Sequence, residues 1–323
     1  MGSGSSEERS DGSGGATQAS AAAAVAGDAA HLAPLARTDI RTLVFGLDLD
    51  HPEGVTTGPD GTLYAGGVRG QIYKIDPAGS YSEIVCTGGV SLGLCADGDG
   101  AVYVCNPMKR AVLRVSPDGR VDTWCDRAGD TDLVLPNDCA FGPDGSLWVT
   151  DSGEENPDRP SGRLLRVPPG GGVAEVQPLD PLHFANGICV DDAGVVYLLE
   201  SFRRRLSAYA NGKLTTVATT PRHNPDGVSL DRNGGFVIAS YYPFALLTLT
   251  SGSATPKTLF EDEWGITLKM PANTSFFGEG LRELAISNLG GFAISATRPP
   301  VPGAPLHYPK GFAMAPSGRG RAS

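Results

Sequence analysis

Four oxygen-bearing side chains stand at the same position of a phrase that returns six times along the chain. That position, the second of each phrase, holds Glu53, Asn137, Asn186 and Asp226. Together they form an all-oxygen set with a charge of −2, which suits Ca²⁺, or Mg²⁺ or Mn²⁺ with several waters retained. Softer metals prefer Cys or His ligands. We therefore predict one divalent-cation site, with Ca²⁺ as the favoured ion.

The two remaining phrases differ at this position. Leu92 cannot bind a metal, and Asn273 is a candidate to face the substrate or to support the ligands. Fourteen residues after four of the second positions comes another polar residue, in each case at the expected end of a strand: Asn106, Asp151, Glu200 and Ser240. We expect Asp151 and Glu200 to face the substrate. Capping of the strand ends is an equal alternative.

Three of the five histidines precede these phrases closely, namely His51, His183 and His223. Histidine titrates near neutral pH, so a proton-transfer or substrate-binding role is open to it. Loop histidines are also common as plain surface residues. His223, three residues before Asp226, is the best functional candidate.

The spacing of the phrases indicates the fold that positions these side chains. Their second residues are 39, 45, 49, 40 and 47 residues apart, a period typical of propeller blades. Eight residues after five of them comes a turn glycine, often within an Asp-Gly or Asn-Gly pair that suits a tight hairpin. Short runs rich in β-branched and aromatic residues follow, and no long stripe of period 3.6 favours a helical solenoid. We predict an all-β, six-bladed propeller with about four antiparallel strands per blade, whose innermost strands bring the four side chains to one axis.

The predicted propeller spans residues 38–298, and Thr38–Leu47 is expected to add an edge strand that closes the ring on the last blade. Residues 1–37 are rich in Gly, Ser and Ala, which predicts a disordered or low-complexity segment. Residues 299–323 are expected to form an extended tail on the surface. The polar loop 151–162 is a candidate lid over the mouth of the channel, or a surface excursion.

Composition excludes several classes of partner. The net charge of −10 disfavours nucleic acid and anionic membranes, and no run of 18 apolar residues could span a bilayer. None of the six cysteines forms a CxxC pair, so we expect reduced structural thiols and a cytoplasmic protein. A small-molecule substrate fits these observations.

The phrases around Glu53, Asn137, Asn186 and Asp226 resemble the motifs of the SMP-30/gluconolactonase family over about residues 50–295. Members of that family are six-bladed propellers with a catalytic divalent cation, commonly calcium. The resemblance implies that Glu53, Asn186 and Asp226 are the core ligands and that Asn137 is a ligand or a substrate contact. It also makes Asp226 the candidate general base.

Two features depart from that pattern. Leu135 stands where lactonases of the family often have an Arg, and Val55 stands where Pro commonly follows the first motif. The segments Leu198–Ser201 and Arg203–Leu206 also resemble strictosidine-synthase-like propellers, in which the metal set is often incomplete.

The predicted function is the metal-dependent hydrolysis of a lactone or a related small ester. No Gly-x-Ser-x-Gly elbow provides a serine nucleophile instead. Two alternatives stay open at this point. One is a non-catalytic binding platform with a structural metal, and the other is hydrolysis of a different ester such as a phosphotriester.

Overall fold

The computed structural model describes Met1 and residues 33–312. Two compact units divide the chain, Met1–Ala33 and Pro34–Ser323, and the strands of the described residues all belong to the second. The low-complexity prediction for residues 1–37 falls largely on residues outside the described part. Within that part, no helix is long and apolar enough to cross a membrane.

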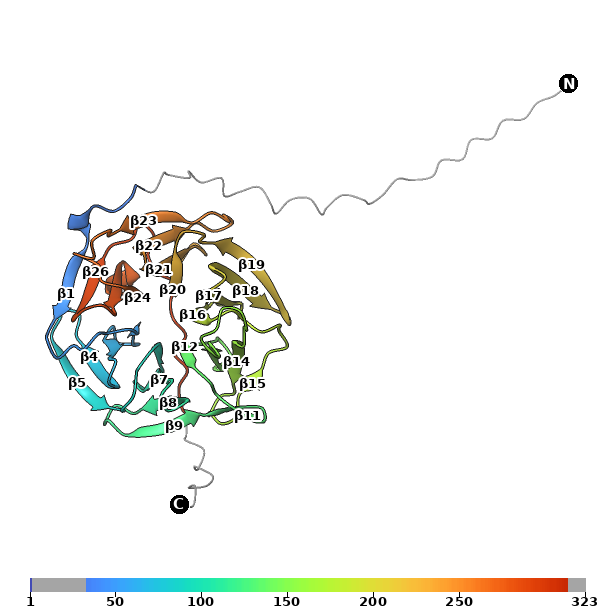
Figure 1. The fold of residues 1–323 in the computed structure, drawn as a ribbon, viewed down its shortest axis with the longest axis horizontal. Helices are drawn as coiled ribbons and strands as arrows, with labels where there is room; N and C mark the ends of the chain where they lie inside the picture. The colour runs from blue at the N-terminus through green and yellow to red at the C-terminus, as the bar shows by residue number, and fades with distance from the viewer. Residues whose placement is uncertain (2–32, 313–323) are drawn as a thin grey trace, which may run out of the picture. The chain divides into compact units, whose positions relative to one another are not determined.

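Six four-stranded antiparallel sheets form a ring, which confirms the predicted propeller (Figure 1). Blade 1 contains β2 (Val55–Thr57), β3 (Leu63–Gly66), β4 (Gln71–Ile75) and β5 (Tyr81–Cys86). Blade 2 contains β6 (Leu94–Ala96), β7 (Val102–Asn106), β8 (Ala111–Val115) and β9 (Val121–Cys125). Blade 3 contains β12 (Pro136–Phe141), β13 (Leu147–Asp151), β14 (Arg163–Val167) and β15 (Glu175–Val176).

The second half of the ring repeats this plan. Blade 4 contains β16 (Ala185–Val190), β17 (Val196–Glu200), β18 (Arg205–Ala210) and β19 (Lys213–Thr219). Blade 5 contains β20 (Asn224–Leu230), β21 (Phe236–Tyr242), β22 (Phe244–Leu249) and β23 (Lys257–Glu261). Blade 6 contains β24 (Pro271–Phe277), β25 (Glu283–Asn288), β26 (Ala293–Thr297) and the N-terminal strand β1 (Arg41–Phe45).

The ring is closed by pairing between the two ends of the propeller. Strand β1 lies antiparallel to β26, with Arg41 opposite Ala296 and Phe45 opposite Ala293. The expected edge strand within Thr38–Leu47 is therefore confirmed. Because the first strand completes the last blade, the sixth sheet has the same four strands as the others.

The hairpins between the first two strands of the blades are stabilised by an aspartate that accepts backbone N–H groups and by a glycine with a positive φ. In blade 5, Oδ1 of Asp231 accepts hydrogen bonds from the backbone N–H groups of Asn233 and Gly235, both at 2.8 Å. Gly234 has a φ of 77°, a conformation that costs glycine little. These turns fix the register of the innermost strands, and hence the level at which their first residues lie.

The core lies between neighbouring sheets rather than on the axis. Between blades 2 and 3, the ring of Tyr103 meets Trp124 and Phe141 edge-on, with centroids 4.9 and 5.0 Å apart. All six cysteines are free thiols, and all but Cys86 are buried. Cys95, Cys139 and Cys189 lie in innermost strands, where they serve as small apolar residues.

Part of the predicted C-terminal tail, residues 299–312, is described and is held against the propeller; residues 313–323 lie outside the described part. Residues 299–312, which we call the C-terminal strap, cross the ring at the end where the Asp-Gly turns lie (Figure 1). The strap contacts every blade. Its contact residues are Leu281, Leu230, Asp191, Thr57, Gly98, Asp99 and Phe141.

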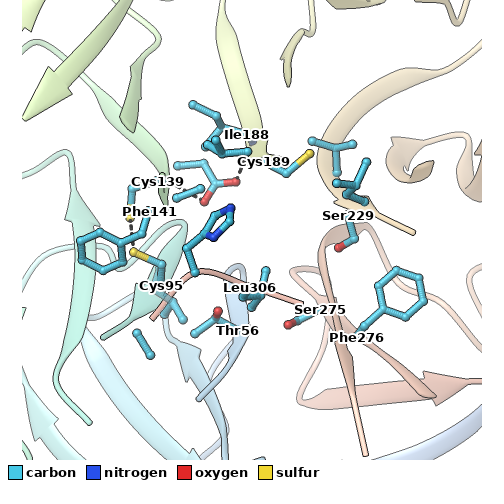
Figure 2. Close-up of a pocket in the computed structure, with 18 of the residues that line it drawn as sticks. Thr56, Cys95, Cys139, Phe141, Ile188, Cys189, Ser229, Ser275, Phe276 and Leu306 are labelled. Carbon is cyan, nitrogen blue, oxygen red and sulfur yellow. Dashed lines mark hydrogen bonds between the residues drawn. The ribbon is translucent and has the colours of Figure 1, made fainter. Parts of the chain in front are cut away.

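The strap and the innermost strands enclose a cavity of about 70 Å³ on the axis. Its lining includes the thiols of Cys95, Cys139 and Cys189, and Leu306 of the strap lies among these side chains (Figure 2). The Sγ atoms of Cys95 and Cys139 are 3.6 Å apart. The strap thus covers the far end of the channel, opposite the predicted cation ligands.

Candidate functional site

The four predicted ligands all lie at the start of the innermost strands of their blades. Asn137, Asn186 and Asp226 are the second or third residues of β12, β16 and β20, and Glu53 comes two residues before β2. Each is 5–7% exposed. A position that recurs in register on neighbouring blades is brought to one level of the axis by the symmetry of the ring.

Electrostatic effects link three of these residues. The charge of Asp226 in blade 5 raises the pKa of Glu53 in blade 1. The side-chain amide of Asn186 in blade 4 opposes the effect of burial and lowers the pKa of Asp226. Burial is the larger effect for both acids: it raises the pKa of Glu53 well above its ordinary value and that of Asp226 to about 7.

No lysine or arginine of residues 33–312 forms an ion pair with Glu53 or Asp226. Two buried carboxylates without a cationic partner are costly unless protons or a metal ion neutralise them. Two oxygens of the set, Oε2 of Glu53 and Oδ1 of Asn137, are buried without a hydrogen-bond partner. These donors therefore fit a hard divalent cation, although the ligand set itself stays a prediction.

A divalent cation at this site would need the side-chain amides of Asn137 and Asn186. Among residues 33–312, no group of three or more His, Cys, Asp or Glu side chains could hold a metal ion. The predicted set contains only two carboxylates, so any ion bound here needs the oxygens of Asn137 and Asn186 as well. Binding at this site therefore depends on which way the two amides point.

Asp138 is a residue of the site that the sequence analysis missed. It is buried, its pKa is raised well above the ordinary range by that burial, and its charge raises the pKa of Glu53. Its carboxylate accepts hydrogen bonds from the backbone N–H of Ile188 at 3.2 Å and from Nδ2 of Asn273 at 3.3 Å. Asp138 thus joins blades 3, 4 and 6 at the axis.

A signal for Asp138 was present in the repeat. The residue after each predicted ligand is glycine in blades 1, 4 and 5, and Gly93 holds the same place in blade 2. A Cβ on Gly93 would lie 1.9 Å from Oδ1 of Asp138. Asp138 is therefore a carboxylate at a repeat position where blades 1, 2, 4 and 5 have glycine, and its side chain occupies the space beside Gly93.

Asp151 and Glu200, which we expected to face the substrate, are completely buried and have polar partners within the protein. Asp151 pairs with Arg163 and accepts the N–H groups of Val134 and Leu135 at 3.0 and 2.7 Å. Glu200 pairs with Arg205 and accepts the N–H of His183 at 3.0 Å. These contacts favour the alternative of strand-end capping: each acid holds the loop that leads into an asparagine of the predicted set.

Among the histidines, His223 remains the candidate for proton transfer or substrate binding. It is buried, its Nε2 has no hydrogen-bond partner, and it lies 3.6 Å from Oε2 of Glu261. Burial lowers its pKa, which favours the neutral ring. By contrast, Nδ1 of His51 is 2.8 Å from its neighbour Asp50, and its ring packs against Phe292.

The candidate lid, the loop 151–162, has one electrostatic link to the region of the predicted ligands. Burial raises the pKa of Tyr241, and the charges of Asp226 and of Glu155 in the loop raise it further. Tyr241 lies near the end of the second strand of blade 5, on the same side of the ring as the predicted ligands. The role of the loop as a lid stays a prediction.

The raised pKa of Asp226 predicts an unusual pH dependence. A neutral buried carboxyl whose pKa rises from 3.8 to about 7 on folding contributes stability below pH 4, and this is lost as the pH rises through 7. We expect the melting temperature of chelator-treated protein to fall between about pH 4 and pH 7. Calcium at pH 8 should restore it. Asp226→Asn, which is neutral throughout, should reduce the fall; an equal fall in this variant would contradict the assignment.

A ring of six four-stranded blades, with buried carboxylate and amide oxygens at one end of its axis, defines a propeller with an axial polar site. Residues 51–289 match the SMP-30/Gluconolactonase/LRE-like region, and the chain belongs to this family. The resemblance seen in the motifs is thereby confirmed. No curated protein sequence matches the chain.

Solved structures share this fold at low identity. A gluconolactonase from Xanthomonas campestris is 20% identical, with a TM-score of 0.68 over 81% of this chain and 89% of its own. Regucalcin from Agrobacterium tumefaciens, a calcium-binding protein, is 16% identical, with a TM-score of 0.67 over 83% and 98%. A streptogramin B lyase is 14% identical, with a TM-score of 0.58 over 80% and 96%. These likenesses show the fold alone.

Proposed function

We propose that this protein is a divalent-cation-dependent hydrolase that opens a lactone or a related small ester, with Ca²⁺ as the favoured ion. The observation that carries the proposal is the pair of buried carboxylates, Glu53 and Asp226, at the start of the innermost strands of blades 1 and 5, neither of which forms an ion pair with a lysine or arginine of residues 33–312. Family membership and the likeness to a gluconolactonase and to a calcium-binding regucalcin support it.

Glu53, Asn137, Asn186 and Asp226 would hold the cation through their oxygens. When bound, it would supply Lewis acidity toward a carbonyl oxygen of the substrate. Asn273 and Asp138 bridge the axis below and close the site toward the inner cavity. Leu135, where family lactonases often have an arginine, is half-buried beside the blade 3 motif.

Asp226 is the proposed general base. It would accept the proton of an attacking water at a carboxylate oxygen, while His223 lies three residues away at the same mouth. Burial raises the pKa of Asp226 to about 7 in the metal-free chain, which makes its carboxylate a stronger base than an exposed one, and a bound cation would lower that pKa. The six free thiols are consistent with the proposed cytoplasmic location.

Calorimetric titration of calcium into chelator-stripped protein tests the proposal directly. We expect saturable binding at one site, because the ion neutralises carboxylates that the fold buries together. Asp226→Ala removes one ligand, and this variant should lose the binding while it keeps its circular dichroism spectrum.

Activity assays then separate the remaining alternatives. Turnover of lactones by the calcium-loaded protein supports the proposal, whereas turnover of phosphotriesters alone would reassign the substrate class. Binding without turnover of any ester would favour a platform with a structural metal. No binding by a folded sample would mean that the four oxygens do not act as one site.

A further inference from the structure

Two serines occupy equivalent places beside the predicted asparagine ligands. Ser152 and Ser201 directly follow the second strands of blades 3 and 4, each 15 residues after its asparagine. Nδ2 of Asn137 lies 3.0 Å from Oγ of Ser152, and Nδ2 of Asn186 lies 3.0 Å from Oγ of Ser201. Both serines are buried.

The single hydroxyl proton of each serine decides which way the amide points. Oγ of Ser152 lies 2.6 Å from the carbonyl oxygen of Ala185, and a carbonyl can only accept. Ser152 must therefore donate its proton there and accept a hydrogen bond from Asn137. Only Nδ2 can donate, so Oδ1 of Asn137 points away, and it is buried without a partner.

Blade 4 repeats the same arrangement. Oγ of Ser201 lies 2.7 Å from the carbonyl oxygen of Pro225, so this serine also has no proton left for an amide oxygen. The amide of Asn186 donates to Ser201. Its Oδ1 remains available for another partner.

Each serine also donates to a backbone carbonyl of the next blade, directly before the predicted ligand of that blade. Ala185 immediately precedes Asn186, and Pro225 immediately precedes Asp226. One hydroxyl thus fixes the amide of its own blade and the backbone at the ligand of the following blade. In blade 6, Ser287 accepts the backbone N–H of Asn273 at 2.8 Å and donates to the carbonyl of Glu53 in blade 1.

We propose that Ser152 and Ser201 are positioning residues of the cation site, which turn the oxygens of Asn137 and Asn186 toward the axis and hold the next ligand in place. This inference rests on the proposed cation-dependent function. Partners that orient a metal ligand typically change metal affinity by about 10- to 100-fold when they are removed. Ser152→Ala and Ser201→Ala are expected to weaken calcium binding by that amount.

The test is calcium calorimetry on the wild type and both alanine variants, with Ser207→Ala as the matched control. Ser207 is a buried serine of β18 in blade 4 whose Oγ has no hydrogen-bond partner. We expect this control to bind calcium as the wild type does. Should an alanine variant fail to fold, Ser152→Cys and Ser201→Cys fill nearly the same space with a much weaker donor, and the same loss is expected.

Repeating the test in an Asn186→Asp variant separates loss of amide orientation from a general destabilisation of the site. A carboxylate presents oxygen at both ends, so Asn186→Asp removes the need for the amide to be oriented. Ser201→Ala should then cost less calcium affinity in the Asn186→Asp background than in the wild type. An equal cost in both backgrounds would leave only a structural role and overturn the proposal.

The outcomes distinguish the positioning role from the proposed function. A wild type that binds calcium, with serine variants that bind within about twofold of it, would overturn the positioning role alone. A folded wild type that binds no calcium would overturn the proposed function and this inference together.

Discussion

Asp226→Asn is expected to reduce the turnover of a lactone substrate by roughly 10²- to 10⁴-fold, the usual contribution of a general base. The substitution keeps the size of the side chain but removes the group that accepts the proton. It also removes a buried carboxylate that has no cationic partner among residues 33–312, so the metal-free fold should be at least as stable. Initial rates at several substrate concentrations measure the effect, with thermal unfolding as the check on folding.

Two further variants make this result specific. Asp192→Asn removes a charge from a side chain that is 89% exposed, and we expect unchanged rates. Glu53→Gln should weaken cation binding, so its activity should recover at saturating calcium, whereas Asp226→Asn should stay slow. Near-normal turnover by well-folded Asp226→Asn would remove Asp226 as the base.

Ending the chain after Arg298 is expected to lower the free energy of unfolding by roughly 3–5 kcal/mol. The truncation deletes the C-terminal strap. Its backbone hydrogen bonds to Leu230, Leu281 and Gly98 are lost, as are the contacts of the Phe312 ring with blades 2 and 3. Denaturant unfolding followed by tryptophan fluorescence measures the loss, because Trp124 lies 5.5 Å from Phe312 by ring centroids.

The matched control ends the chain after Phe312, which keeps every contact described for the strap, and we expect wild-type stability. Thiol labelling gives an independent readout, because removal of the strap opens the cavity lined by Cys95, Cys139 and Cys189. These three thiols should react faster in the shorter chain only. Equal stability and equal labelling in both truncations would show that the strap neither stabilises the propeller nor covers the cavity.

The fold was predictable because it is a repeated local pattern. Each blade repeats its Asp-Gly turn and its strands within 39 to 49 residues, so strand order and the shared level of Glu53, Asn186 and Asp226 follow from the chain itself. The closing strand β1 was also predictable, because an extra strand before the first blade pairs naturally with an incomplete last sheet.

The features that escaped prediction depend on contacts between distant residues. The amide of Asn273 hydrogen-bonds Asp138, which is 135 residues away in the sequence. No residue near Asp138 in the sequence indicates this partner. The roles of Ser152 and Ser201 depend on carbonyl groups of the following blade. Asp151 and Glu200 stand at the same position of their blades, which suggested a shared role. The direction of each side chain decides whether it faces a substrate or a neighbouring arginine, and the sequence pattern does not give that direction.

The strap determines how molecules enter and leave this protein. A propeller channel open at both ends would let substrate arrive on one side while product departs on the other. Here Leu306 and its neighbours cover one end, and the bridge between Asp138 and Asn273 crosses the axis above the cavity. In the proposed hydrolase, arrival and departure would use the same opening, so product that has not yet left would exclude the next substrate, and we expect it to act as a competitive inhibitor.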